Sequence, residues 1–181
     1  SVPSEIKRET VENILSNKHI KGWKTQNYDG NDDRIQPFPI GLDFHTDRGF
    51  NSLEELKRIR DLKIDRKMKI FCDVHLSYRD KFGGERGRVR EILKDSENVD
   101  FLEGRIPLVD IFKKYKEYQF VISTHGNGLD CHRTWEIIYL GGIVVTKTSC
   151  LDPLYKDLPV VIVKDWDECK DPANLEKWRD K

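Results

Sequence analysis

The chain of 181 residues is long enough for one domain with a hydrophobic core, or one domain with a short appendage, but too short for a complete two-domain enzyme. Apolar residues make up 37% and charged residues 35%, and 32 basic side chains balance 32 acidic ones, so nothing global attracts the protein to nucleic acid or anionic lipid. No stretch approaches the ~20 apolar residues of a membrane span, and the first residues are charged rather than signal-like. We expect a soluble, cytoplasmic protein.

The cysteines show neither close pairing nor the spacing of a zinc site. They are Cys72, Cys131, Cys150 and Cys169. Two of them, Cys72 and Cys150, lie in or beside apolar runs. The pattern favours buried free thiols in a reducing compartment.

The first 47 residues differ from the rest of the chain. Ser4 to Ser16 has apolar residues near helical spacing, with Ser4 as a helix cap. From Lys18 to Asp47 the pattern breaks down into Gly, Asn, Asp and Pro around one apolar island at Phe38 to Leu42, which indicates a linker or the edge of something missing. We therefore divide the chain into residues 1–47, a helix and linker, and residues 48–181, an α/β domain.

Helices and strands alternate from residue 52 onward. Ser52, with Glu55 three residues later, predicts the start of a capped helix. The expected helices are Ser52 to about Leu62, Glu85 to Lys94, Leu108 to Tyr115 and Asp130 to Leu140, and the expected strands are Lys69 to Val74, Val99 to Leu102, Phe120 to Ser123, Ile143 to Thr146 and Val160 to Val163. This alternation predicts a Rossmann-like α/β fold, with a mostly parallel sheet and helices on both faces. Ligands of such sheets bind beyond the carboxyl ends of the strands, so the loops at 75–88, 103–107, 124–133 and 147–152 are the places to search.

A glycine turn joins the strand at Phe120 to the helix at Asp130. The turn consists of Thr124, His125, Gly126, Asn127 and Gly128. Its glycines allow positive φ and close approach of a ligand to the backbone. With Asp130 as a cap, the following helix would present unpaired amides and the positive end of its dipole, which favour phosphate.

Two charged residues on that helix complete a candidate nucleotide site. Arg133 offers a two-pronged donor for phosphate, and Glu136, three residues along the same face, can accept from ribose hydroxyls. An equally strong interpretation is that Gly126 and Gly128 only form a tight turn, while Arg133 and Glu136 form a helical ion pair.

A longer stretch of sequence resembles a known family. Tyr118–Glu136 (YQFVISTHGNGLDCHRTWE) continues through Ile137–Val145 to Leu151–Tyr155, Asp157–Val160 and Asp165-Trp166. That order resembles the C-terminal, donor-binding half of exostosin-like GT-B glycosyltransferases, including small enzymes encoded by large DNA viruses. The resemblance is close over the last third of the chain and loose over Phe38 to Leu102. For a viral enzyme the cytoplasm would be that of the host.

The resemblance implies transfer of a hexose or pentose from a nucleotide sugar to a glycan or glycoprotein, with no cofactor and no metal. It implies diphosphate and ribose contacts for Gly126, Asn127, Gly128, Arg133 and Glu136. A full enzyme of this type has an N-terminal acceptor domain, whereas only about 45 residues precede the donor-type fold here. The resemblance therefore implies that residues 1–47 can be the remnant of an acceptor domain and that residues 48–181 bind the nucleotide sugar. We therefore expect weak donor binding and little transfer by this chain alone, with a missing domain or a homo-oligomer as possible partners.

Other polar residues lie in the same loops. Arg79, Arg86 and Arg88 belong to a glycine-rich and arginine-rich loop that can close over phosphates, although such loops are often simply exposed. Thr148, near Asp152, can touch the sugar or the nucleotide, or belong to a turn that starts a helical segment.

Two Asp-His pairs complete the candidates. Asp43 and His45 can bind metal or act as acid and base, and they are the only candidates for the general base that an inverting transfer requires. Asp73 and His75, with His125 and Asn127, suggest a metal-dependent phosphoesterase as the alternative, although a strand-end hydrogen bond explains the first pair more simply. A non-catalytic nucleotide-binding module is the third possibility.

Overall fold

The computed structural model describes residues 8–27, 32–48, 51–74, 85–126 and 128–181. Its centre is a five-stranded sheet in which every strand pair is parallel, in the order β4-β3-β5-β6-β7. The strands are β3 (Lys67–Cys72), β4 (Val99–Phe101), β5 (Tyr118–Ile122), β6 (Ile143–Lys147) and β7 (Val160–Val163). This arrangement confirms the predicted Rossmann-like α/β fold.

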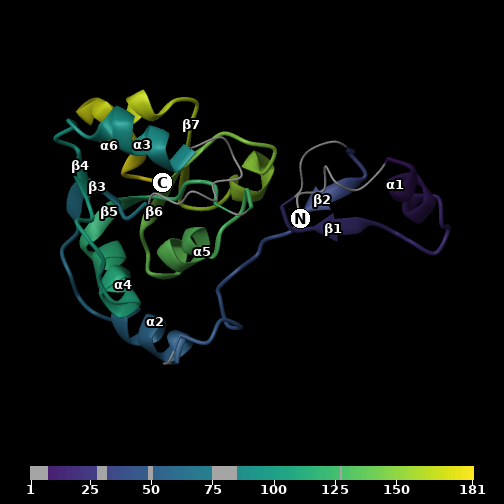
Figure 1. Cartoon of the computed structure of the whole chain (residues 1–181), viewed down its shortest axis with the longest axis horizontal. Coiled ribbons are helices and arrows are strands. Elements are labelled where there is room, and N and C mark those ends of the chain that lie inside the picture. The colour runs from purple at the N-terminus through teal and green to yellow at the C-terminus, as the bar shows by residue number, and fades with distance from the viewer. Residues whose placement is uncertain (1–7, 28–31, 49–50, 75–84, 127) are drawn as a thin grey trace.

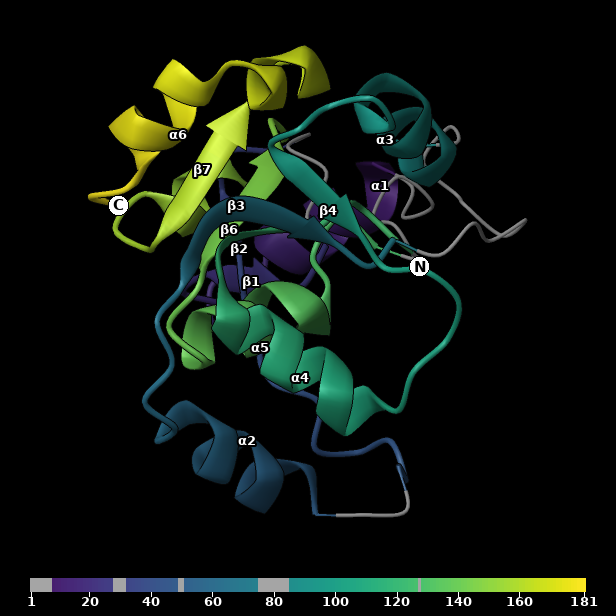
Figure 2. The ribbon, with the colours of Figure 1, turned by 90° about the vertical axis from the view of Figure 1, so that its left-hand side faces the viewer.

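Helices cover both faces of the sheet (Figure 2). One face packs against α2 (Ser52–Arg60), α4 (Leu108–Glu117), α5 (His132–Tyr139) and the short 3₁₀ helix η2 (Asp152–Tyr155). The other face packs against α3 (Glu85–Leu93), the 3₁₀ helix η3 (Trp166–Lys170) and α6 (Pro172–Trp178).

The central strand shows why two cores form. Successive side chains of a strand point to opposite faces. Accordingly, Phe120 and Ile122 pack with the α3 side, Val121 packs with the α5 side, and all three are fully buried. A strand covered on both faces has no polar face, which explains its continuous apolar sequence.

The order in which strands are added to the sheet reverses between β3 and β5. From β3 it passes through α3, on one face, to β4 at the edge; from β5 it passes through α5, on the opposite face, to β6 on the other side. Strands β3 and β5 are neighbours, with Ile70 opposite Phe120. Their carboxyl ends therefore flank a topological switch point, where open α/β sheets bind ligands.

The N-terminal part is more structured than predicted. Helix α1 (Arg8–Leu15) and a parallel pair of short strands, β1 (Trp23–Thr25) and β2 (Ile35–Pro37), form an extension that projects from the α/β body (Figure 1). We call the described residues 8–27 and 32–37 the arm. The interpretation of 18–47 as a linker was therefore wrong in part, since three-residue strands give little periodic signal.

Several local predictions can be checked. Helix α2 is capped by Asn51, whose Oδ1 accepts from the amide of Glu54 at 3.2 Å, so the predicted cap at Ser52 was wrong. Residue Ser4 lies outside the described residues. All four cysteines are free; Cys72 and Cys169 are buried, whereas the other two are partly exposed. Within the described ranges, no helix combines the length and apolar character that crossing a bilayer demands.

Candidate functional site

The candidate site lies at the switch point. Asp73 follows β3, and the residues from Ser123 to Gly126 follow β5, so both segments leave the sheet at its carboxyl edge. Arg133, in the first turn of α5, connects them: its Nε lies 3.2 Å from Asp73 Oδ1. The residues that the sequence placed in the glycine turn, on α5 and at the end of β3 are thus brought together.

Tyr115 completes this ion pair from α4. Its hydroxyl donates to Asp73 Oδ2 at 2.8 Å and accepts from Arg133 Nε at 3.2 Å. Burial tends to lower the pKa of Arg133, but Asp73 and Tyr115 outweigh burial and raise it above its usual range. Among the described residues only Nε of this guanidinium is bonded, so its two terminal nitrogens are left for an anion.

The glycines are required for space rather than for their φ angles. Gly126 does not have a positive φ, so the access to positive φ that its glycine offers is not used there. A Cβ at Gly126 would lie 2.8 Å from Arg86 Nη2 and 3.2 Å from Cys131 Sγ. Arg86, which the sequence proposed as a phosphate contact, therefore lies beside the glycine turn.

Asn27 of the arm fills the space beside the second glycine. A Cβ at Gly128 would overlap the Asn27 carboxamide, with Nδ2 at 2.7 Å. Asn27 Oδ1 also accepts a hydrogen bond from the amide of Asp130 at 2.8 Å. The side-chain carbonyl of Asn27 thus binds the Asp130 amide just before α5, where we expected a phosphate oxygen to bind.

Asp130 does not cap the helix. The N-cap is Cys131, and it makes no side-chain cap bond. The Asp130 carboxylate, only 2% exposed, instead accepts bonds from the Ile40 amide at 2.8 Å, Trp135 Nε1 at 2.9 Å and the Tyr155 hydroxyl at 3.3 Å. Burial raises its pKa, and these hydrogen bonds oppose the shift. The Asp130 carboxylate therefore holds the segment at Ile40 in place and is not available to a bound nucleotide sugar.

Arg48 links Glu136 of the predicted nucleotide site to Asp43 of the predicted general-base pair. It was not predicted from the sequence. Its Nη1 donates to Glu136 Oε1 at 3.0 Å, and its Nη2 donates to Asp43 Oδ2 at 2.8 Å. Glu136 therefore pairs with Arg48 rather than with its helical neighbour Arg133. Burial raises the pKa of Glu136, and Arg48 opposes part of that rise. Glu136 Oε2 has no bonded partner among the described residues.

Asp43 and His45 form the pair that the sequence predicted. Asp43 Oδ1 accepts from the amides of His45, at 3.2 Å, and Thr46, at 3.0 Å, and lies 3.2 Å from His45 Nδ1. Burial tends to raise the pKa of Asp43, but hydrogen bonds from Thr46 and Arg48 outweigh burial and hold it well below its usual range. The His45 side chain is 75% exposed.

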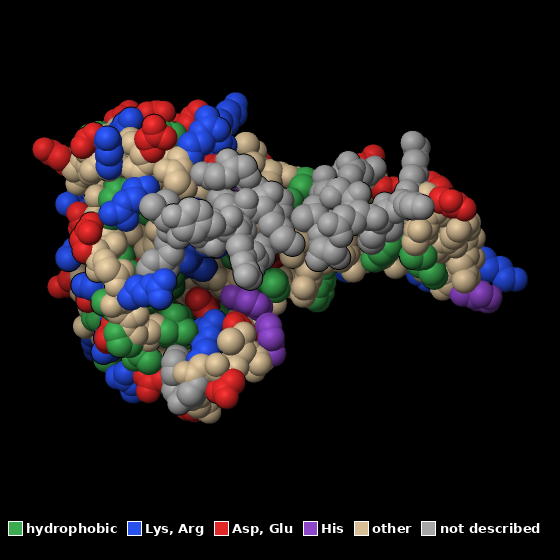
Figure 3. All heavy atoms as spheres, viewed as in Figure 1, with side chains coloured by type: hydrophobic (Ala, Val, Ile, Leu, Met, Phe, Trp, Pro, Cys, Tyr) green, Lys and Arg blue, Asp and Glu red, His purple; other side chains and the backbone are tan. Residues whose placement is uncertain are grey.

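His132 lies beside this pair at the start of α5. Its ring centroid is 5.3 Å from that of His45, and its Nδ1 lies 2.8 Å from the carbonyl oxygen of Gly41. In Figure 3, histidine side chains reach the surface in the middle of this face, next to acidic and basic side chains.

The remaining predicted residues divide into three groups. Thr124 is buried, and its Oγ1 has no hydrogen-bond partner in the described part of the chain. His125 is partly exposed, and Thr148 Oγ1 donates to Asp152 Oδ2 at 2.6 Å, which fits the turn that starts η2 rather than a free ligand contact. Arg79, His75 and Asn127 lie outside the described residues. The phosphoesterase alternative depends on two of these, and its Asp73 is held by Arg133.

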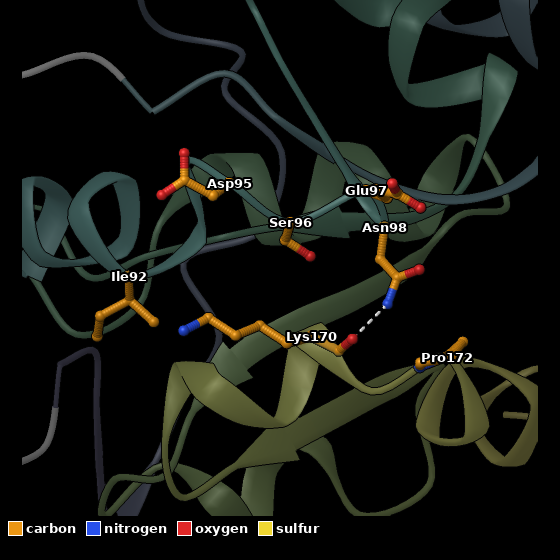
Figure 4. A pocket seen from close by; sticks show the side chains of 7 residues that line it. All are labelled: Ile92, Asp95, Ser96, Glu97, Asn98, Lys170 and Pro172. Carbon is orange, nitrogen blue, oxygen red and sulfur yellow. Dashed lines mark hydrogen bonds between the residues drawn. The ribbon is translucent and has the colours of Figure 1, made fainter.

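A pocket lies at the opposite edge of the sheet. Its lining, drawn in Figure 4, is Ile92, Asp95, Ser96, Glu97, Asn98, Lys170 and Pro172. Most of these residues precede the amino end of β4, and Asn98 Nδ2 donates to the Lys170 carbonyl at 2.8 Å. The lining mixes both signs of charge with no paired polar groups aimed at one point, so we do not assign the site there.

Comparisons of the sequence with known proteins give no family. No protein-family model matches the chain, and no curated protein matches it.

Proposed function

We propose that the protein binds a nucleotide sugar at the switch point and serves as the donor-binding part of a metal-independent GT-B glycosyltransferase. The observation that carries this proposal is the position of Arg133. It lies at the start of α5, between the carboxyl ends of β3 and β5, with its terminal nitrogens unbonded among the described residues.

The diphosphate has several suitable partners there. The amides of the first turn of α5 and the positive end of the helix dipole favour an anion. The guanidinium of Arg133 adds a charged, bidentate donor, and that of Arg86 lies beside Gly126. The buried hydroxyl of Thr124 supplies a neutral donor. Glu136 Oε2 suits a ribose hydroxyl, by analogy with the acidic residue of dinucleotide sites.

The donor must displace Asn27 from the Asp130 amide. The carboxamide oxygen of Asn27 stands in for a phosphate oxygen at that donor. A phosphate oxygen is charged, and charge-assisted hydrogen bonds are stronger than neutral ones. The Asp130 amide should therefore bind a phosphate oxygen more strongly than the Asn27 side chain. The competition is one reason to expect modest affinity.

The transfer step needs a departing anion and an acceptor nucleophile. The acceptor oxygen attacks the anomeric carbon, the bond from that carbon to the diphosphate breaks, and the electron pair leaves with the nucleoside diphosphate. Arg133 and the helix amides would stabilise that charge. In an inverting reaction the acceptor proton would pass to His45, whose ring is oriented by Asp43 at 3.2 Å.

Calorimetric titration with UDP, GDP and their sugars, in the presence of a chelator, tests the proposal. We expect binding to the wild type that is lost in Arg133→Ala and Glu136→Ala but kept in the control Arg179→Ala, whose side chain is 56% exposed at the far end of the chain. Unchanged affinity in both site variants would refute the assignment. Binding without transfer to any glycan would favour a non-catalytic nucleotide-binding module.

A further inference from the structure

Asp43, His45 and His132 present one carboxylate and two imidazoles to a common point. One ligand atom from each residue lies within 4.8 Å of the other two. We propose that these three residues bind a single transition-metal ion of the zinc class. Two histidines and one carboxylate form a ligand set that binds zinc and similar transition metals in preference to magnesium or calcium.

The spacing suits one ion. A tetrahedral ion with bonds of ~2.1 Å holds its ligand atoms about 3.4 Å apart. Asp43 Oδ1 and His45 Nδ1 are already 3.2 Å apart. His132 is the more distant member, and the His45 ring, 75% exposed, is free to rotate toward it.

The hydrogen bond to Gly41 prepares His132 as a ligand. A carbonyl oxygen only accepts, so His132 Nδ1, at 2.8 Å from it, carries the hydrogen. The lone pair of the neutral ring is then on Nε2. Histidines that bind metal usually donate their other nitrogen to a carbonyl or carboxylate in this way, which fixes the tautomer and the ring plane.

The local charge also permits a cation. Arg48 donates to Asp43 Oδ2 at 2.8 Å and would repel an ion if it were the only neighbour. It is shared, however, with Glu136 at 3.0 Å, so one guanidinium faces two carboxylates. The three groups carry one net negative charge, and Asp43 Oδ1, the atom nearest His45, is not the atom that Arg48 uses.

This inference goes beyond the proposed function and does not depend on it. An ion on His45 removes the lone pair that an acceptor proton would need, so metal binding and the base role exclude each other. We therefore expect zinc to inhibit any transfer activity rather than support it.

Metal titration of the full chain tests the site. Protein stripped with a chelator is titrated with Zn²⁺ by calorimetry and with Co²⁺ by visible absorption, with no nucleotide present. We expect one equivalent to bind, and His45→Ala and His132→Ala each to weaken binding by at least about tenfold. The control His19→Ala, an exposed histidine of the arm, should bind as the wild type does.

Two results would overturn the proposal. One is absence of binding at one equivalent, or equal binding by the wild type and both variants. The other is a Co²⁺-thiolate band in the near ultraviolet that disappears in Cys131→Ser, because it would show that the ion prefers the adjacent cysteine. If His132→Ala does not fold, His45→Ala decides, since its side chain is largely exposed. Absence of nucleotide binding leaves this result unaffected.

Discussion

The Oδ1 atom of Asn27 accepts a hydrogen bond from the backbone amide of Asp130 at 2.8 Å, although 103 residues separate them in the sequence. Asn27 itself has a φ of 52°, a conformation that asparagine tolerates better than most residues. The contact brings the arm against the glycine turn of the α/β body. It makes the arm a competitor for any anion that binds there.

Removing the Asn27 side chain should strengthen donor binding. Asn27→Gly keeps the positive φ accessible while deleting the carboxamide. A neutral hydrogen bond contributes about 1 kcal/mol, so we expect nucleoside diphosphate to bind about fivefold more tightly. Calorimetry measures the change, and Asn13→Ala, an exposed asparagine of α1, is the control. Weaker binding by Asn27→Gly would mean that Asn27 helps to hold the nucleotide.

Adding a methyl group at Gly128 should expel the same side chain. In Gly128→Ala the new Cβ overlaps the Asn27 carboxamide, and we expect a loss of about 1–3 kcal/mol in the free energy of unfolding. Hydrogen exchange at the Asp130 amide should also become faster.

A double variant separates this contact from other effects of the methyl group. Asn27→Gly in the Gly128→Ala background should recover most of the lost stability, because nothing remains to collide. Gly22→Ala, where an added Cβ meets nothing within 4 Å, should be neutral. Strict additivity of the two changes would show that the contact is absent in solution.

The Arg133–Asp73 pair should stabilise the fold as well as support binding. Arg133→Ala leaves Asp73, 3% exposed, as a buried charge without its cation, at a cost of about 3 kcal/mol. Adding Asp73→Asn removes that charge, so the double variant should recover part of the stability without recovering nucleotide binding. Urea unfolding and calorimetry together test this. A fully stable single variant would contradict the ion pair.

The buried thiols should resist alkylation at pH 8. Burial raises the pKa of Cys72 and of Cys169 to about 12. At pH 8 the thiolate fraction of each is then about one in ten thousand. Peptide mapping by mass spectrometry should show Cys150 modified first and these two protected until urea unfolds the protein. Equally fast modification of Cys72 in the native state would argue against this packing.

The α/β body could be predicted because its signals are local. Each central strand is a short apolar run, such as Phe120 to Ile122, and each is followed by a helical pattern. The arm could not be predicted in the same way. Strand β1 contains Lys24 and β2 ends at Pro37, and neither three-residue strand has a buried face long enough to show alternation.

The site was predictable only in part. Arg133 and Glu136 were found because they share a helix face, and the Asp43–His45 pair was found because it follows an apolar island with alternate spacing. Arg48 was missed because its carboxylate partner Glu136 is 88 residues away and no spacing rule connects them. The cap expected at Asp130 failed because tertiary partners, among them the indole of Trp135, compete for the carboxylate.

The most direct test of the proposed function is nuclear magnetic resonance of protein labelled with ¹⁵N-glycine, titrated with UDP or GDP. The chain has only 12 glycines, so the amides of Gly126 and Gly128 can be followed individually. We predict that these two signals shift with saturation while those of Gly141 and Gly142, between the end of α5 and the start of β6 at the opposite edge of the sheet, do not. A titration that leaves Gly126 and Gly128 unmoved, or shifts only glycines elsewhere, would contradict a nucleotide site at the switch point.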